Sequence, residues 1–156
     1  MRLTALIAAI VFIADQAMKY AVVYGLDLQN RLAVDVLPPF LNLRMAWNRG
    51  VNFGLFTSDA DVMRWVLIAI AVLISGFVLV WAARAPRSTR VYLSVGLLVG
   101  GALGNAVDRV VFGAVADFLN MSCCGFTNPY SFNLADITIF VGALGLIAFA
   151  DGDKTT

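Results

Sequence analysis

The sequence predicts an all-α membrane protein with a small β element: four transmembrane helices and a small extracytoplasmic β-sheet that lies on the membrane surface. Three observations lead to this fold class: the composition, four long apolar segments and one segment with alternating character. Of the 156 residues, 61% are hydrophobic and 13% are charged. Ordinary soluble domains have about 45–50% apolar and about 25% charged residues. We therefore expect a single integral membrane domain over residues 1–156.

Four apolar segments predict the spans. They cover approximately residues 3–26, 65–83, 91–109 and 134–150. A helix needs about 20 mostly apolar residues to cross the hydrocarbon core of a bilayer. The first segment follows Arg2, as the apolar part of a signal peptide would, but it resumes after Lys19 and has no small-residue cleavage site. We therefore expect it to be retained as a span.

Residues 27–62, between the first two spans, predict the extracytoplasmic β region. Apolar residues alternate there with polar or small ones, and Pro38 and Pro39 interrupt any helix. Aromatic and apolar side chains at the membrane surface favour contact with the headgroup layer. The side chains of this kind are Leu37, Phe40, Leu41, Leu43, Trp47, Phe53 and Phe56. An irregular loop is the alternative to a sheet.

The distribution of basic residues predicts that both termini face the cytoplasm. The short link between the second and third spans contains Arg84, Arg87 and Arg90, and the two ends of the chain carry Arg2 and Lys154. Short cytoplasmic segments of membrane proteins are enriched in Lys and Arg. Residues 27–64 and 109–131 are then expected on the outer side.

The third span contains a stripe of small residues. Gly96, Gly100 and Gly104 recur every four residues, which is typical of a helix that packs closely against another helix. Gly101, Asn105 and Asp108 follow a neighbouring stripe of the same helix. The helix therefore presents polar groups where another backbone is expected to come near.

Charged residues within apolar segments need a partner or a cavity, because an isolated charge is costly in a membrane. Asp15 and Lys19 are four residues apart on the first helix and are expected to form an ion pair. That pair is either structural or catalytic. Asp108 and Arg109 point in different directions on a helix, so we expect each to contact another element as scaffold. A backbone group or an arginine of the sheet is the expected partner of Asp108.

Asp117 and Asp136 are the candidate catalytic residues. One lies just past the third span and the other in the first turns of the fourth, so both are expected at the same shallow depth. Two carboxyl groups held close together share a proton near neutral pH. Such a pair can activate water and protonate a leaving group. Because the chain contains no His, catalysis by a Ser–His or Cys–His pair is excluded.

Two asparagines accompany the acids. Asn133 lies three residues before Asp136 and either caps the helix, or orients a carboxylate or binds a substrate backbone. Asn48 lies beside Gly50 and Gly54, a turn-rich setting that either brings backbone groups to a ligand or is simply a turn.

Two further features limit the function classes. The adjacent Cys123 and Cys124 are expected to be unpaired thiols of an outer loop, because neighbouring cysteines can bridge only through a strained ring. The formal net charge of +1 argues against a nucleic-acid partner, which normally binds to a basic surface.

Five short motifs on the four-span frame resemble those of the lipoprotein signal peptidases, or signal peptidase II, the aspartyl proteases of the bacterial inner membrane. They are "DQAMK" at 15–19, "NRGVNFG" at 48–54, "GGALGNAVDR" at 100–109, "VADFL" at 115–119 and "FNLAD" at 132–136. The resemblance runs nearly from end to end. Two departures, Asn52 and the stretch "NMSCCGFTNPY" at 120–130, predict differences in the loops and in substrate preference.

The resemblance implies an endopeptidase that removes the signal peptide from a diacylglyceryl-modified prolipoprotein by cleaving just before the lipidated cysteine. It assigns catalysis to Asp117 and Asp136, without metal or cofactor. It implies a supporting or substrate-contacting role for Asn48, Gly101, Asn105, Asp108, Arg109 and Asn133, and a structural or supporting role for Asp15. It also implies a location in the inner membrane among its lipids, with the active site near the extracytoplasmic face. A monomer would suffice.

Three alternatives remain at the level of sequence. A small proton- or cation-coupled transporter would use Asp108, Asp117 and Asp136 as an ion path, although such groups are normally near the middle of the membrane. A lipid-headgroup enzyme would use the same three acids to hold magnesium. A non-catalytic assembly subunit would explain the glycine stripe but not the two shallow aspartates.

Overall fold

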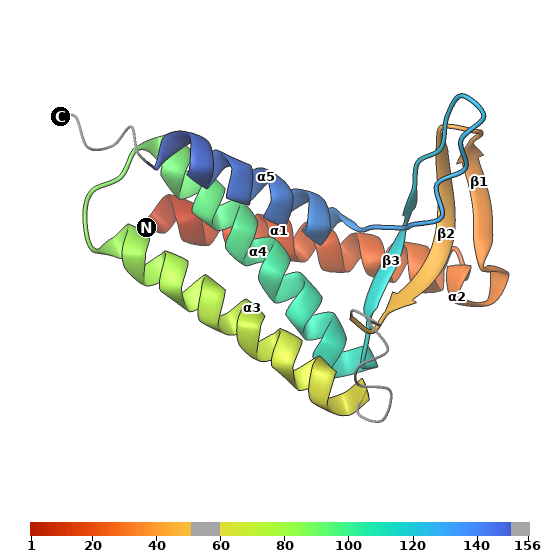
Figure 1. Cartoon of the computed structure of the whole chain (residues 1–156), viewed down its shortest axis with the longest axis horizontal. Coiled ribbons are helices and arrows are strands. Elements are labelled where there is room, and N and C mark those ends of the chain that lie inside the picture. The colour runs from red at the N-terminus through yellow and green to blue at the C-terminus, as the bar shows by residue number, and fades with distance from the viewer. Residues whose placement is uncertain (51–59, 151–156) are drawn as a thin grey trace.

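The computed structural model describes residues 1–50 and 60–150, which form a helical bundle and a three-stranded antiparallel sheet. Figure 1 shows the sheet standing across one end of the bundle, with the N-terminus at the opposite end. The long helices are α1 (Arg2–Tyr20), α3 (Ala60–Ala83), α4 (Thr89–Phe112) and α5 (Leu134–Phe149). Helix α4 contacts each of the other three and forms the centre of the bundle.

Three helices in the described part of the chain are long and apolar enough to cross a membrane. They are α1 with its π-helical continuation η1 (Ala21–Gly25), α3 and α4. Helix α5 is apolar but has only 16 residues. At about 1.5 Å per residue it is roughly 24 Å long, whereas the hydrocarbon core is about 30 Å thick. The prediction of a membrane fold is confirmed with three candidate spans, and the fourth span stays a prediction.

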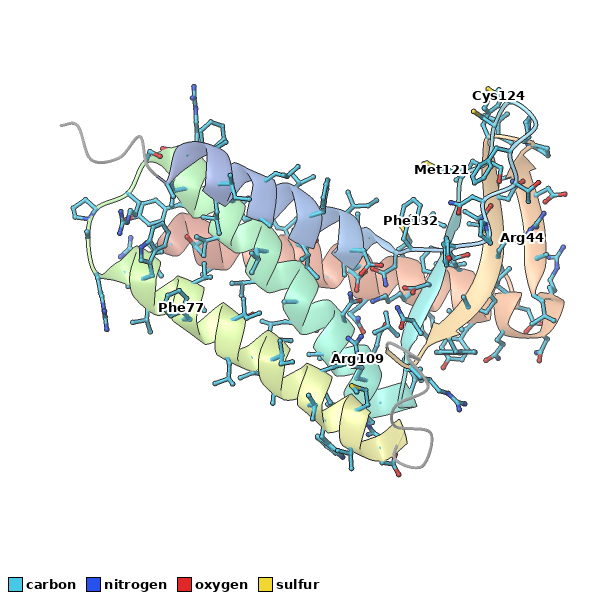
Figure 2. All side chains as sticks on the ribbon, in the orientation of Figure 1. Arg44, Phe77, Arg109, Met121, Cys124 and Phe132 are labelled. Atoms are coloured by element: carbon cyan, nitrogen blue, oxygen red, sulfur yellow. The ribbon has the colours of Figure 1, made fainter. Side chains whose placement is uncertain are left out.

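Glycines allow α4 to approach its neighbours closely. A Cβ atom on Gly100 would lie 2.7 Å from the carbonyl oxygen of Ala8 in α1, and one on Gly101 would lie 2.5 Å from Oγ1 of Thr138 in α5. Gly96 and Gly104 also face α1, so the predicted packing role of the stripe is confirmed. Helix α3 is mostly exposed, and its Phe77, labelled in Figure 2, is 72% exposed.

The sheet has the order β1-β2-β3. Its strands are β1 (Ala33–Leu37), β2 (Leu41–Asn48) and β3 (Val115–Asn120). The first two confirm the strands predicted within residues 27–62, in place of an irregular loop. The third strand was missed, and so was the short helix α2 (Leu28–Arg31). Residues 115–118 of β3 are all buried, so the strand lacks the alternation by which a half-exposed strand is recognised.

The end of α4 directs the chain into β3. Gly113 follows the helix with φ +76°, a left-handed conformation that favours glycine and commonly ends a helix. Strand β3 then pairs with β2, with Asp117 opposite Ala46 and Val115 opposite Asn48. The turn at Gly113 thus places Asp117 on the sheet, at the boundary between sheet and helices.

Candidate active site

Asp117 and Asp136 come together where β3 meets the start of α5. The N–H of Leu119 in β3 donates to the carbonyl oxygen of Phe132 at 2.8 Å, and the N–H of Phe132 donates back to Leu119 at 3.0 Å. The segment before α5 therefore runs along the free edge of β3. Figure 2 labels Phe132 at this junction. As a result Asn133, the next residue, lies beside Asp117.

Asn133 joins the two aspartates. Its Nδ2 donates to Oδ1 of Asp117 at 2.6 Å, and its backbone N–H donates to Oδ2 of Asp136 at 3.2 Å. Its own Oδ1 accepts from the backbone N–H of Asp136 at 2.9 Å, which completes a capping box at the start of α5. The sequence left open whether Asn133 caps the helix or orients a carboxylate. It does both, and its side chain is fully buried.

Two further asparagines complete the hydrogen bonding of the aspartates. Nδ2 of Asn48 donates to Oδ2 of Asp117 at 3.1 Å, and Nδ2 of Asn105 donates to Oδ1 of Asp136 at 2.8 Å. Asn48 is itself held by the N–H of Gly50, which donates to its Oδ1 at 3.0 Å. Each of the four carboxyl oxygens therefore accepts a hydrogen bond from an N–H group.

Asp117 has an unusual electrostatic environment. Its side chain lies in the interior, and the residue is only 3% exposed. Burial, followed by repulsion from the nearby Asp136, raises the pKa of Asp117 to about 6, although the bonds from Asn48 and Asn133 and the charge of Lys19 oppose the change. A group with such a pKa exchanges its proton close to neutral pH.

A buried cluster behind the aspartates connects α1 with α4. Nζ of Lys19 lies 2.7 Å from Oδ2 of Asp15 and 2.8 Å from Oδ2 of Asp108. The predicted ion pair between Asp15 and Lys19 is thus confirmed. Asp108 also accepts from the backbone N–H of Ala116 at 3.2 Å, as predicted. Of the two alternatives, the backbone group is therefore found, and the charged partner of Asp108 is Lys19 rather than an arginine of the sheet.

Helix α5 is held by this cluster too. Oδ1 of Asp15 accepts from the N–H of Ala135 in the first turn of α5 at 2.9 Å. Gln16 adds a bond from its Nε2 to Oδ1 of Asp108 at 3.0 Å. Sequence reasoning missed Gln16 and did not include Lys19 among the site residues. Their signal was present, because any polar side chain within an apolar helix needs a partner.

Arg109 and Gly101 lie at the edge of the site. Nη1 of Arg109 donates to the carbonyl oxygen of Asn105 at 3.2 Å, and its positive charge is near enough to attract both Asp136 and Asp117. A Cβ atom on Gly101 would lie 2.6 Å from the carbonyl oxygen of Ala135. Gly101 therefore lets the first turn of α5 come close to α4.

Some sequence predictions concern other parts of the chain. Asn52, Phe53, Gly54 and Phe56 lie outside the described residues. Cys123 and Cys124 are free and exposed, as expected. Within residues 1–50 and 60–150, no group of three or more His, Cys, Asp or Glu side chains is arranged to hold a metal ion. The three-aspartate arrangement required by the magnesium alternative is therefore not found there.

The chain resembles known proteins over most of its length. Residues 7–150 match the family described as "Signal peptidase (SPase) II". A protein named "Lipoprotein signal peptidase" from Methylobacterium sp. (strain 4-46) is 46% identical over 140 residues, which cover 90% of this chain and 83% of the relative. Another of the same name, from Methylobacterium radiotolerans, is 40% identical over 139 residues, which cover 86% of this chain and 77% of the relative.

The fold has a solved counterpart as well. A structure described as a bacterial membrane enzyme, determined at 1.9 Å resolution, superposes with a TM-score of 0.79 and 27% identity over 98% of this chain and 94% of the other. The apolar helices and this neighbour indicate a multi-pass membrane protein. From the family match and the close relatives, we conclude that the chain belongs to the signal peptidase II family and is a membrane protease.

Proposed function

We propose that this protein is an aspartic endopeptidase that removes the signal peptide from diacylglyceryl-modified prolipoproteins, cleaving just before the lipidated cysteine. Asp117 and Asp136 are the catalytic pair. One observation carries the proposal: Asn133 hydrogen-bonds both carboxyl groups, so the two acids are fixed beside one another. The names of the relatives supply the substrate class.

The pair performs the reaction by exchanging protons with water and substrate. One carboxylate accepts a proton from water as the water oxygen attacks the scissile carbonyl. The other, protonated, carboxyl group donates its proton to the carbonyl oxygen. When the tetrahedral intermediate breaks down, a proton passes to the leaving amine and the peptide bond is cleaved. The raised pKa of Asp117, about 6, supports a pair that holds one shared proton at a pH close to that value.

The remaining predicted site residues have supporting roles in this proposal. Asn48, Asn105 and Asn133 orient the carboxyl groups through their hydrogen bonds. Asp15 and Asp108 hold the helices in place through Lys19. Gly101 admits the start of α5, and the positive charge of Arg109 favours the negatively charged form of the pair.

The membrane arrangement follows from the position of the site. The pair lies at the end of the bundle that carries the sheet, and the link with Arg84, Arg87 and Arg90 lies at the other end (Figure 1). With α5 as a fourth span, the basic link and both termini face the cytoplasm. The site then lies near the extracytoplasmic face of the bacterial inner membrane. A lipidated substrate enters laterally from the bilayer, with its peptide extended against the sheet.

The contacts also bear on the transporter alternative. Asp108 is bound by Lys19 at 2.8 Å and by a backbone N–H, so it is not free to carry an ion between Asp117 and the bilayer. The two remaining acids lie in β3 and in the first turn of α5, beside the sheet rather than in the middle of a long helix. All residues of the proposed site come from a single chain, so a monomer is sufficient.

The experiment is cleavage of a diacylated prolipoprotein by the purified protein in lipid vesicles. Asp117→Asn and Asp136→Asn are each expected to lower the rate by about three orders of magnitude or more, because each removes one of two cooperating acids. Asp35→Asn is the control, since Asp35 is an exposed acid of β1 paired only with Arg44 in the described residues. Near-normal cleavage by either folded variant of the pair would refute the proposal.

A further inference from the structure

The ammonium group of Lys19 is enclosed by three acceptors. The residue is 4% exposed, and its Nζ lies 2.7 Å from Asp15 and 2.8 Å from Asp108. The third contact is a hydrogen bond that Nζ donates to Oδ1 of Asn105 at 3.1 Å. An ammonium has three N–H donors and no acceptor. Lys19 therefore uses all three donors, one of them on Asn105.

This contact fixes which way the amide of Asn105 faces. The oxygen and nitrogen of an amide can normally exchange places, but an NH₂ group cannot face an ammonium without two donors meeting. Nδ2 of Asn133 also donates to Oδ1 of Asn105, at 3.2 Å. With Oδ1 held by two donors, Nδ2 of Asn105 must point to Asp136, where it donates at 2.8 Å.

We propose that Lys19 is a positioning residue of the catalytic pair: acting through Asn105, it keeps Asp136 as the ionised partner and leaves the shared proton on Asp117. This inference rests on the proposed function and deepens it, because it assigns each acid its part. A fixed N–H donor stabilises a carboxylate more than a neutral carboxyl group. Loss of Lys19 would leave only the 3.2 Å bond from Asn133 to hold the oxygen of Asn105, so the amide could turn that oxygen toward Asp136.

The surroundings of the two acids agree with this assignment. Asp136 lies in the first turn of α5, where the helix dipole favours a negative charge, and it is only partly buried. Asp117 is 3% exposed on β3, and although the charge of Lys19 also favours its ionised form, burial and repulsion from Asp136 outweigh that effect. Among the described residues, the charged groups that act on the pair are Lys19 from α1 and Arg109 from α4, while β2 contributes the neutral Asn48.

The assignment defines the path of each proton. Asp136 accepts a proton from water as the new carbon–oxygen bond forms, and Asp117 gives its proton to the carbonyl oxygen. Collapse of the intermediate breaks the carbon–nitrogen bond, and the proton held by Asp136 passes to the leaving amine. Reprotonation of Asp117 from the hydroxyl of the intermediate restores the starting state, so no external acid or oxidant is required.

The test is the pH dependence of kcat for Lys19→Met, measured with a diacylated prolipoprotein in vesicles. Without the ammonium, the amide of Asn105 is no longer held with its N–H group toward Asp136, so the acidic limb of the profile should move up by about one pH unit. On that limb we expect kcat to fall about tenfold at a given pH, with little change in KM. A folded variant with an unmoved acidic limb would overturn the inference, because a purely structural loss lowers kcat equally at every pH.

Two further variants isolate the route through Asn105. Gln16→Leu removes bonds from the same cluster, to Asp15 and Asp108, but leaves the contact of Lys19 with Asn105 intact, so its acidic limb should not move. Lys19→Met combined with Asn105→Ala should give the acidic limb of Asn105→Ala alone, since the ammonium acts on Asp136 through that amide. Additive shifts in the double variant would contradict the proposed route.

The failure of this inference is distinguishable from failure of the proposed function. If Lys19→Met does not fold, the double variant Lys19→Met with Asp108→Asn is used instead, because it keeps the net charge of the cluster. The same shift of the acidic limb is then measured. Cleavage that survives in Asp117→Asn or Asp136→Asn would refute the function itself. If Asp117→Asn and Asp136→Asn are inactive but the acidic limb of the kcat–pH profile does not move in the Lys19 variants, only the role of Lys19 is refuted.

Discussion

The carboxylate of Asp15 accepts a hydrogen bond from the backbone N–H of Ala135 at 2.9 Å, between residues 120 positions apart. Ala135 lies between Asn133 and Asp136 at the start of α5, so the first helix of the chain holds the turn that carries half of the proposed site. The other oxygen of Asp15 contacts Lys19 at 2.7 Å. One buried acid therefore links the stability of the bundle to the geometry of the pair.

Replacement of Asp15 by Ala is expected to destabilise the protein strongly. It removes one partner of a buried ion pair and leaves the N–H of Ala135 unsatisfied, a change that typically costs about 3–5 kcal/mol. Chemical unfolding in detergent micelles measures the free energy of unfolding. Asp35→Ala is the matched control, because its ion pair with Arg44 is exposed and such pairs contribute about 0–1 kcal/mol. Equal losses in the two variants would contradict the structural role of Asp15.

Replacement of Gly101 by Ala is expected to displace α5 and reduce cleavage. Its added methyl group would meet Oγ1 of Thr138 at 2.5 Å and the carbonyl oxygen of Ala135 at 2.6 Å. Overpacking of this kind costs about 1–3 kcal/mol, and the shift acts directly on the turn that carries Asp136. Gly76→Ala in α3 is the control, since a Cβ there meets nothing within 4 Å. Alanine in a helix is more favourable than glycine by about 0.5–1 kcal/mol, so this variant should be slightly more stable and fully active.

The helices and most of the site were predictable because their signals are local. Long apolar segments mark the helices, and the spacing of Gly96, Gly100 and Gly104 marks a packing stripe. Asp15 and Lys19 stand one turn apart, so their pairing follows from helix geometry alone. Asp117 and Asp136 could be identified because a charged side chain beside an apolar segment needs a partner or a cavity.

The rest depended on contacts between distant segments. Strand β3 is buried on both faces, so it lacks the alternation that identified β1 and β2. The bridging position of Asn133 requires residue 132 to pair with the edge of β3, and such pairing has no signature within one segment. The orientation of Asn105 likewise follows only when Lys19 of α1 is placed against α4.

Replacement of Asn48 by Ala is expected to move the alkaline limb of the kcat–pH profile. The hydrogen bond from Asn48 lowers the pKa of Asp117, so its loss should raise that pKa further above about 6. Asp117 would then keep its proton to higher pH, and the alkaline limb should shift upward. Asn30→Ala is the control, because Asn30 bonds only its neighbour Asp27 at the surface among the described contacts. A shift of the acidic limb instead would mean that Asp117 is the ionised partner.

Replacement of Asp117 by Asn should change how stability depends on pH. The folded protein holds a proton on Asp117 up to a pKa of about 6, whereas the unfolded chain releases it near the ordinary value of 3.8. Between these values the folded state binds more protons than the unfolded state, so the free energy of unfolding rises as pH falls. A difference of about two pH units corresponds to about 3 kcal/mol, which is the upper bound of this contribution.

Asp117→Asn has no proton to bind, so it should lack this rise. Chemical unfolding of both proteins in micelles at pH 7.5 and at pH 4 gives the comparison. The difference in free energy of unfolding, variant minus unsubstituted protein, should be more favourable to the variant at pH 7.5 than at pH 4. The lost hydrogen bonds lower the stability of the variant by the same amount at both pH values, so they do not affect this comparison. Asp35→Asn, at an exposed acid, should run parallel to the unsubstituted protein. If the stability of Asp117→Asn instead changes with pH as that of the unsubstituted protein does, folding does not alter the pKa of Asp117. The raised pKa would then not be a property of the folded site.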